Sequence, residues 1–282
     1  MLKLNDIAVD LNKFPDGTML MKADLYNKYC RCQRDAKNKG ENVMVSITWF
    51  YENDTELIAL IYLTRHLQTK GFTDIRLNMP YVPNARQDRV KKDEDVFTLK
   101  YFTEVINSLG FSAVTVLDVH SNVGLALINN VRERDPSYFI TKAVSDIKDR
   151  NNDVEPFIFY PDAGAEKRYG NMLQMPCAYG VKTRDWETGQ LADEIQVYGT
   201  DVTDLQGKPV LIVDDICSRG GTFVRAAKAL KKLNAGKIYL YVTHCENTIL
   251  DGVLLTDGYV EEVYTTNSVF KEKHERIHVM HL

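Results

Sequence analysis

Residues 210–223, VLIVDDICSRGGTF, constrain the fold of this chain more than any other segment. The first four residues are branched and apolar, as in a strand that is buried on both faces of a sheet. Two adjacent carboxylates follow, and a Gly-Gly turn then leads into a helix predicted over 222–233. This succession of strand, turn and helix predicts an α/β sheet with crossover helices.

The same segment has the chemistry of a sugar-phosphate site. Asp214 and Asp215, at the end of the predicted strand, are suited to ribose hydroxyls or to a metal ion. The turn through Gly220 and Gly221 opens a helix and presents free backbone N–H groups to a phosphate. Neither a Walker A loop nor a dinucleotide-binding glycine fingerprint is present. A strand–turn–helix unit with an acidic cap and no ligand is the structural alternative.

Apolar runs of strand length alternate with helical patterns along the chain. Strands are predicted at 43–50, 75–79, 113–119, 157–160, 177–181, 210–214, 238–243 and 260–264, and helices between 53 and 71, at 97–109 and at 222–233. The length of 282 residues favours two domains, and the polar segment 135–155 is the predicted boundary region. We expect domains at 1–140 and 141–282, each a mainly parallel sheet flanked by helices.

Composition narrows the class of partner. The net charge of −4 and the pI of about 5.9 argue against non-specific binding of nucleic acid. No apolar run approaches the ~18 residues of a membrane span, and no secretory signal is evident. The five cysteines contain no C-x-x-C pair, so reduced thiols are expected. We therefore expect a cytoplasmic protein without nucleic-acid or membrane partners.

Two further segments follow predicted strands and carry groups for polyphosphate binding. In 80–89, Arg86 and Arg89 are three residues apart, and guanidinium groups bind phosphate oxygens bidentately. A solvated surface turn fits this composition equally well.

His120, together with Asp162 after a later strand, has the ligand types for a hard cation bridged to phosphates. A histidine that only makes a structural hydrogen bond is the more common case.

Lys182 and Arg184 lie at the base of a long polar loop that runs to residue 190. Basic residues in such a loop are able to close over a phosphoryl group. Taken alone, a solvated charged loop is the better interpretation of this segment.

Together, these segments resemble the ribose-phosphate diphosphokinases, also called phosphoribosyl diphosphate synthetases, over nearly the whole chain. Six landmarks occur in the order of that family: Phe14–Gly17, Pro80–Arg89, Asp118–His120, Tyr160–Asp162, Lys182 with Arg184, and Val213–Thr222. The last loop alone is shared with phosphoribosyltransferases, whereas A-R-Q-D-R is not. The resemblance implies two domains of phosphoribosyltransferase-like type, an N-terminal ATP-binding domain at 1–140 and a C-terminal ribose-phosphate-binding domain at 141–282. It also implies a magnesium cofactor and a homo-oligomer.

The resemblance also implies a role for each matching residue. ATP would be bound by Phe14, Asp16, Arg86, Gln87, Arg89 and His120, the first two reaching the adenine of a neighbouring subunit's site. Magnesium would contact His120 and Asp162, and the transition state would be stabilised by Lys182 and Arg184. The ribose phosphate would be bound by Asp214, Asp215, Ser218, Arg219, Gly220, Gly221 and Thr222. In the implied reaction, the C1 hydroxyl of a ribose attacks the β-phosphorus of ATP and AMP leaves.

The departures from the family concern the acceptor. Ser218 stands where a third carboxylate is usual, and Arg219 stands where a threonine is usual. The loop is thereby more positive by about two charges, which suits a 5′ substituent with a second phosphate. ADP-ribose is such a molecule, and bacteriophage relatives of the family are linked to rebuilding NAD through a diphosphorylated ADP-ribose. Ribose 5-phosphate and ADP-ribose both remain expected acceptors. Thr18 also replaces an acid near the adenine contact.

Two other functions stay open at this point. A type I phosphoribosyltransferase would use only the shared loop and would not need Arg86 and Arg89. A non-catalytic regulator or assembly partner would have the same scaffold. The presence of Lys182, Arg184 and His120 weighs against the regulator, because it would not need them.

Overall fold

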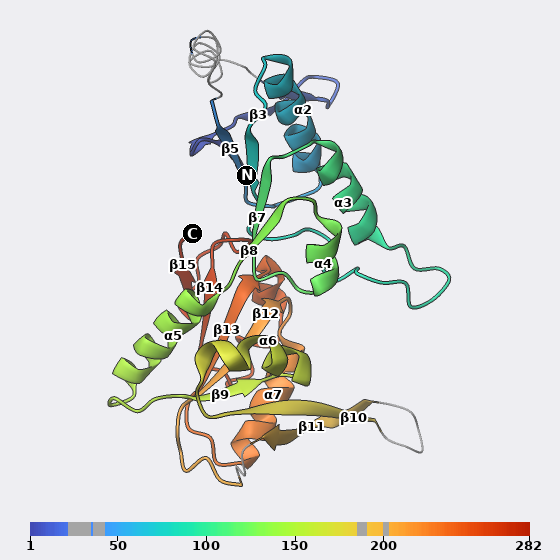
Figure 1. Cartoon of the computed structure of the whole chain (residues 1–282). Helices are drawn as coiled ribbons and strands as arrows, with labels where there is room; N and C mark the ends of the chain where they lie inside the picture. The colour runs from blue at the N-terminus through green and yellow to red at the C-terminus, as the bar shows by residue number, and fades with distance from the viewer. Residues whose placement is uncertain (22–34, 36–42, 185–190, 200–202) are drawn as a thin grey trace. The chain divides into compact units, whose positions relative to one another are not determined.

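The computed structural model of the chain describes residues 1–21, 35, 43–184, 191–199 and 203–282, without the side chains of 182–184 and 191–194. These residues divide into two compact units, unit 1 at Met1–Arg134 and unit 2 at Asp135–Leu282. Figure 1 shows unit 1 in blue to green and unit 2 in green to red. A boundary at 140/141 would cut helix α5 (Ser137–Arg150), which contacts strands of unit 2. The assignment of ATP to one unit and ribose phosphate to the other stays a prediction.

Unit 1 contains a six-stranded sheet in the order β2-β1-β5-β6-β7-β8. Its strands are β1 (Leu2–Leu4), β2 (Ile7–Ala8), β5 (Val45–Trp49), β6 (Ile75–Asn78), β7 (Ala113–Leu117) and β8 (Val131–Arg134). The four strands from β5 to β8 are parallel, whereas β1 pairs antiparallel with β5. A separate hairpin is formed by β3 (Leu11–Lys13) and β4 (Met19–Met21).

In the described part of unit 1, three helices connect the parallel strands. They are α2 (Thr55–Thr69), α3 (Thr98–Ser108) and α4 (Asn122–Leu127). Leu60 and Leu63 of α2 and Ile106 of α3 belong to one buried cluster with the inward residues of the sheet. Apolar residues at helical spacing therefore give the helices one buried face, as the sequence pattern indicates.

Unit 2 contains a seven-stranded sheet in the order β11-β10-β9-β12-β13-β14-β15. The strands are β9 (Phe157–Tyr160), β10 (Cys177–Arg184), β11 (Leu191–Gly199), β12 (Val210–Cys217), β13 (Ile238–Cys245), β14 (Glu262–Thr266) and β15 (Ile277–Met280). β10 and β11 are antiparallel, and the other neighbouring pairs are parallel.

Three helices and a short 3-10 turn complete unit 2: α5, α6 (Ala163–Leu173), α7 (Gly221–Lys232) and η1 (Asn247–Asp251). α5 contacts β13 and β14, α6 contacts β9, β10 and β12, and α7 contacts β11. In Figure 1 the β10–β11 hairpin runs beside α7. Phe223 and Leu230 of α7 lie in the buried core of this unit, so the helix is fixed on the sheet.

The architecture confirms the predicted fold class, an α/β protein with mainly parallel sheets flanked by helices. Among the described residues, no helix combines the length and apolar character that crossing a bilayer requires. Cys177, Cys217 and Cys245 are free thiols, and Cys30 and Cys32 lie outside the described residues.

Candidate active site

The sheet of unit 2 has a topological switch point between β9 and β12. The chain leaves β9 toward β10 on one side, and β12, the other neighbour of β9, leads to β13 on the opposite side. In open parallel sheets, ligands bind beyond the carboxyl ends of the strands at such a point. Asp162 follows β9 and Asp214 lies in the last half of β12, so both carboxylates are at this position.

Asp162 is the N-cap of α6. Its Oδ1 accepts hydrogen bonds from the amides of Gly164 at 2.9 Å and Ala165 at 3.0 Å. A carboxylate at this place is stabilised by the unpaired amides and by the positive end of the helix dipole. The residue is exposed, and no bond to its Oδ2 is recorded among the described residues. One oxygen thus orients the side chain while the other has capacity for a ligand.

Asp214 and Asp215 form a tightly linked pair. The amide of Asp215 donates to Asp214 Oδ1 at 3.0 Å, and Arg168 Nη1 of α6 lies 3.5 Å from Asp215 Oδ2. Burial raises the pKa of Asp214 well above its usual range, and the charges of Asp215 and Asp162 add to this effect. The pair therefore favours ligands that bring hydroxyl donors or positive charge, such as a ribose or a cation.

The loop after β12 forms an open cradle of backbone amides, which we define as the N–H groups of residues 219–222. Among the described residues, none of these four N–H groups donates to a protein atom. Gly220 has a φ of 80°, and a Cβ added there would lie 2.5 Å from Leu254 Cβ. Gly252 packs equally closely on the carbonyl of Arg219. The neighbouring loop therefore holds the cradle in a conformation that exposes its amides at the start of α7.

Ser218 and Arg219 differ in their environment. The Ser218 hydroxyl lies 2.9 Å from the Thr248 hydroxyl of η1, and it is half-buried. The Arg219 side chain is exposed, and its carbonyl accepts from the amide of Val253. The serine therefore anchors the loop to its neighbour, while the arginine adds positive charge beside the cradle.

In unit 1, the Arg-rich segment follows β6, and His120 follows the neighbouring strand β7. The amide of Gln87 donates to Asn84, which has a φ of 62°, so the segment forms a tight turn. Arg86, Gln87 and Arg89 are exposed on this turn. These three predicted phosphate-binding residues are therefore accessible to a ligand, and their role stays a prediction.

Asp88 is the buried centre of this turn, with a relative exposure of 4%. Arg89 donates to it through Nε at 2.8 Å and Nη2 at 3.2 Å, a bidentate pair. These bonds lower the pKa of Asp88 below its usual range, and the charge of His120 acts in the same direction. Asp88 therefore remains ionised and orients Arg89.

The segment with Phe14 and Asp16 connects β3 to β4. Phe14 is 54% exposed. Asp16 accepts from the amide of Thr18 at 2.9 Å and from its hydroxyl at 2.6 Å, and these bonds lower the pKa of Asp16. Thr18, which replaces the acid of the family, therefore holds the carboxylate in place. The contact with adenine in a neighbouring subunit stays a prediction.

Lys182 and Arg184 are in β10, where the pairing with β11 shifts register between them. Their side chains lie outside the description, so the predicted catalytic role is untested. The predicted magnesium site is also untested. The described residues contain no cluster of three side chains suited to a metal. His120 and Asp162 belong to different units, and their convergence also stays a prediction.

Sequence reasoning missed two residues that organise these sites. Asp88 was available as an acid directly before Arg89 in A-R-Q-D-R, but its burial could not be read from the sequence. Arg168 left no signal in the sequence, because its contact with Asp215 depends on how α6 packs on β12.

Comparisons with known proteins identify relatives of this chain and a shared fold. A sequence family described as the phosphoribosyl synthetase-associated domain matches residues 194–281. The ribose-phosphate pyrophosphokinase of Thermococcus kodakarensis is 30% identical, over 93% of this chain and 86% of the relative. That of Pyrococcus abyssi is 29% identical, over 94% and 85%. The structure of phosphoribosylpyrophosphate synthetase from Mycobacterium smegmatis shares the fold, with a TM-score of 0.73, 19% identity and coverage of 98% and 88%.

The match to these relatives over most of the chain makes this α/β protein an enzyme of the transferase class. The chain belongs to the ribose-phosphate pyrophosphokinase family. The resemblance inferred from six short segments is therefore confirmed over most of the chain.

Proposed function

We propose that this protein transfers the β,γ-diphosphate of Mg-ATP to the C1 hydroxyl of a ribose that carries a phosphate at its 5-position. The new bond joins the C1 oxygen to the β-phosphorus, and the bond from this phosphorus to the oxygen retained by AMP breaks. The observation that carries the proposal is the open amide cradle directly after Asp214 and Asp215, in a member of this family.

The residues of unit 2 bind and orient the acceptor. Asp214 and Asp215 accept hydrogen bonds from the ribose hydroxyls, and the cradle holds the 5-phosphate at the positive end of α7. Fixing the sugar at both ends leaves the C1 hydroxyl as the group directed at ATP. Phosphoryl chemistry depends mainly on such positioning and on charge neutralisation.

The residues of unit 1 and of β10 act on ATP. Arg86, Gln87, Arg89 and His120 bind the phosphates, and Lys182 and Arg184 stabilise the negative charge of the transition state. Magnesium, when bound, neutralises charge on the phosphate oxygens and would be held by Asp162 and His120. The unused oxygen of Asp162 fits this role.

The acceptor is ribose 5-phosphate or a 5′-extended ribose such as ADP-ribose, whose product would serve NAD salvage. The presence of a cation at Arg219, in place of the usual threonine, supports the extended acceptor. The overall match to ribose-phosphate pyrophosphokinases supports ribose 5-phosphate.

One assay tests the function and separates the acceptors. The protein is incubated with Mg-ATP and either ribose 5-phosphate or ADP-ribose, and AMP is followed by chromatography, with an EDTA control. AMP formed with only one acceptor identifies the substrate. Absence of AMP with both would contradict the proposal and favour a regulator. If pyrophosphate is released when phosphoribosyl diphosphate and a base are supplied instead, a phosphoribosyltransferase is favoured.

We also propose that the protein is a cytoplasmic homo-oligomer, because Phe14 and Asp16 are exposed and are assigned to a neighbouring subunit's site. Light scattering coupled to size-exclusion chromatography measures the mass. A monomer at working concentration would contradict this assignment.

A further inference from the structure

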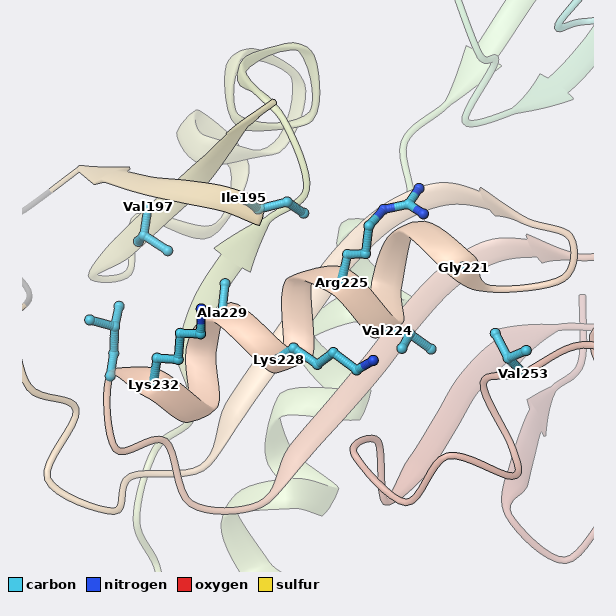
Figure 2. Close-up of a pocket in the computed structure, with 10 residues that line it drawn as sticks. Ile195, Val197, Gly221, Val224, Arg225, Lys228, Ala229, Lys232 and Val253 are labelled. Atoms are coloured by element: carbon cyan, nitrogen blue, oxygen red, sulfur yellow. The ribbon is translucent and has the colours of Figure 1, made fainter. Parts of the chain in front are cut away.

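A groove of about 640 Å³ lies between α7 and β11 in unit 2. Its lining residues are Ile195, Val197, Gly221, Val224, Arg225, Lys228, Ala229, Lys232, Leu233 and Val253. Figure 2 shows Ile195 and Val197 of β11 above the helix that carries Arg225, Lys228 and Lys232. The groove is large compared with a single phosphate, and its lining falls into two chemical halves.

The first half is a row of cations on one face of α7. Arg225, Lys228 and Lys232 are separated by three and four residues, the spacing that places side chains on one side of a helix. All three are exposed, and Lys228 Nζ lies 5.4 Å from the centre of the Tyr259 ring. No acidic side chain lines this groove among the described residues. The row therefore forms a positive surface suited to phosphate groups.

The second half is apolar. Ile195 and Val197 come from β11, and Val224 and Leu233 come from α7. Val253, which follows η1, is 52% exposed at the groove. Ile195 and Val224 are largely buried and form the floor of the groove, whereas Val253 is open to a ligand. A charged row beside such an apolar surface is suited to a ligand with phosphates at one end and a flat organic group at the other, as in a nucleotide.

The groove begins at the cradle. Gly221 contributes one of the open amides and also lines the groove. At a rise of about 1.5 Å per residue, Arg225 starts about 6 Å and Lys228 about 10 Å further along α7. A ligand with one phosphate on the cradle therefore meets the cations next. Arg219, which is exposed at the same end, adds positive charge at the junction.

We propose that this groove binds the 5′ extension of the acceptor, namely the second phosphate and the nucleoside of a ribose linked through a 5′-diphosphate. The inference rests on the proposed function, because it assigns the first phosphate of that diphosphate to the cradle. Ribose 5-phosphate ends at the cradle and leaves the groove unused. The groove therefore gives the enzyme a preference for ADP-ribose over ribose 5-phosphate.

The test compares charge reversals inside and outside the groove. Arg225→Glu and Lys228→Glu place a negative charge in the cationic row, and Lys237→Glu makes the same change at an exposed lysine that does not line the groove. For each folded variant, kcat/KM is measured with ADP-ribose and with ribose 5-phosphate. We expect the ratio of the two values to fall at least tenfold in both groove variants and less than twofold in Lys237→Glu.

A binding measurement separates this inference from the proposed function. Isothermal titration without ATP gives the Kd of the wild-type protein for ADP-ribose and for ribose 5-phosphate, and we expect ADP-ribose to bind at least tenfold more tightly. Equal affinities, or groove variants that weaken both ligands alike, would overturn the groove assignment even if AMP is formed. Tight, groove-dependent binding of ADP-ribose without AMP formation would instead retain the groove and reject the transferase.

Discussion

The two candidate anion sites differ in the chemical groups that would bind the anion. In unit 2, the cradle uses backbone amides, held by close packing of Gly220 on Leu254 and of Gly252 on Arg219. In unit 1, the anion-binding groups are the exposed side chains of Arg86, Gln87 and Arg89 on a tight turn.

This difference indicates how each site selects its ligand. Backbone amides cannot rotate away, so the cradle fits one phosphate geometry and depends on glycine and on its packing neighbours. Long side chains adapt to a polyphosphate, and they depend on an orienting partner such as Asp88. Substitutions should therefore act through the backbone in unit 2 and through charge in unit 1.

The largest effect is expected from a residue outside both anion sites. If Lys182 acts on the transition state, Lys182→Ala should lower kcat by about 10²-fold or more and leave both KM values nearly unchanged. Steady-state kinetics with each substrate varied in turn measure this, with Lys208→Ala, an exposed lysine, as control. Near-normal turnover would remove Lys182 from the mechanism.

The second largest effect is expected from a substitution in the backbone cradle. Gly220→Ala places a Cβ 2.5 Å from Leu254 Cβ at a φ of 80°, so we expect a loss of about 1–3 kcal/mol in unfolding free energy. The acceptor kcat/KM should fall about tenfold to hundredfold, because the amides shift. Chemical denaturation and kinetics provide the readouts.

Gly221→Ala is the matched control for this substitution. A Cβ at Gly221 would meet no atom within 4 Å, and the residue begins α7 without a positive φ. Its unfolding free energy should change by less than about 0.5 kcal/mol. Equal destabilisation by both substitutions would contradict the packing argument.

The third largest effect is expected from substitutions in the side-chain site of unit 1. Arg89→Ala should raise the KM for ATP roughly tenfold, the size expected for a lost hydrogen bond to a charged group. Asp88→Asn should raise the same KM by a smaller factor, because Arg89 keeps its charge and loses its bidentate partner. A larger effect from Asp88→Asn than from Arg89→Ala would contradict this account, because Arg89→Ala removes the oriented group altogether.

The smallest effect is expected at a side chain in the cradle loop. Ser218→Ala removes one hydroxyl that bonds to Thr248, so stability should fall by about 1 kcal/mol or less. The KM for the acceptor should change less than about threefold, because the amides bind the phosphate. A tenfold change would show that Ser218 contacts the ligand and that the cradle is not a purely backbone site.

Most of the central elements could be predicted from the sequence. β9 has its predicted bounds, and β5, β6, β7, β12 and β13 lie within three residues of theirs, as do α3 and α7. Buried parallel strands are continuous apolar runs, and a helix with one buried face repeats its apolar residues every three or four positions. These patterns involve residues that are close together in the chain, so they can be recognised without knowledge of the tertiary structure.

Very short elements and the exact ends of strands could not be predicted in this way. The strands β1 to β4 contain two or three residues each, too few for a periodic signal. β14 begins at Glu262 rather than at residue 260, because its start is fixed by pairing with Tyr239 on β13. Strand ends depend on the partner strand, which a local pattern does not contain.

The sequence by itself determined the α/β class, the family and the order of the site segments, because each of these depends on residues that are neighbours in the chain. Only the tertiary structure decided the raised pKa of Asp214, the packing of Gly220 on Leu254 and the groove between α7 and β11. Each of these arises where segments far apart in the sequence are packed together, and burial and proximity exist only after that packing.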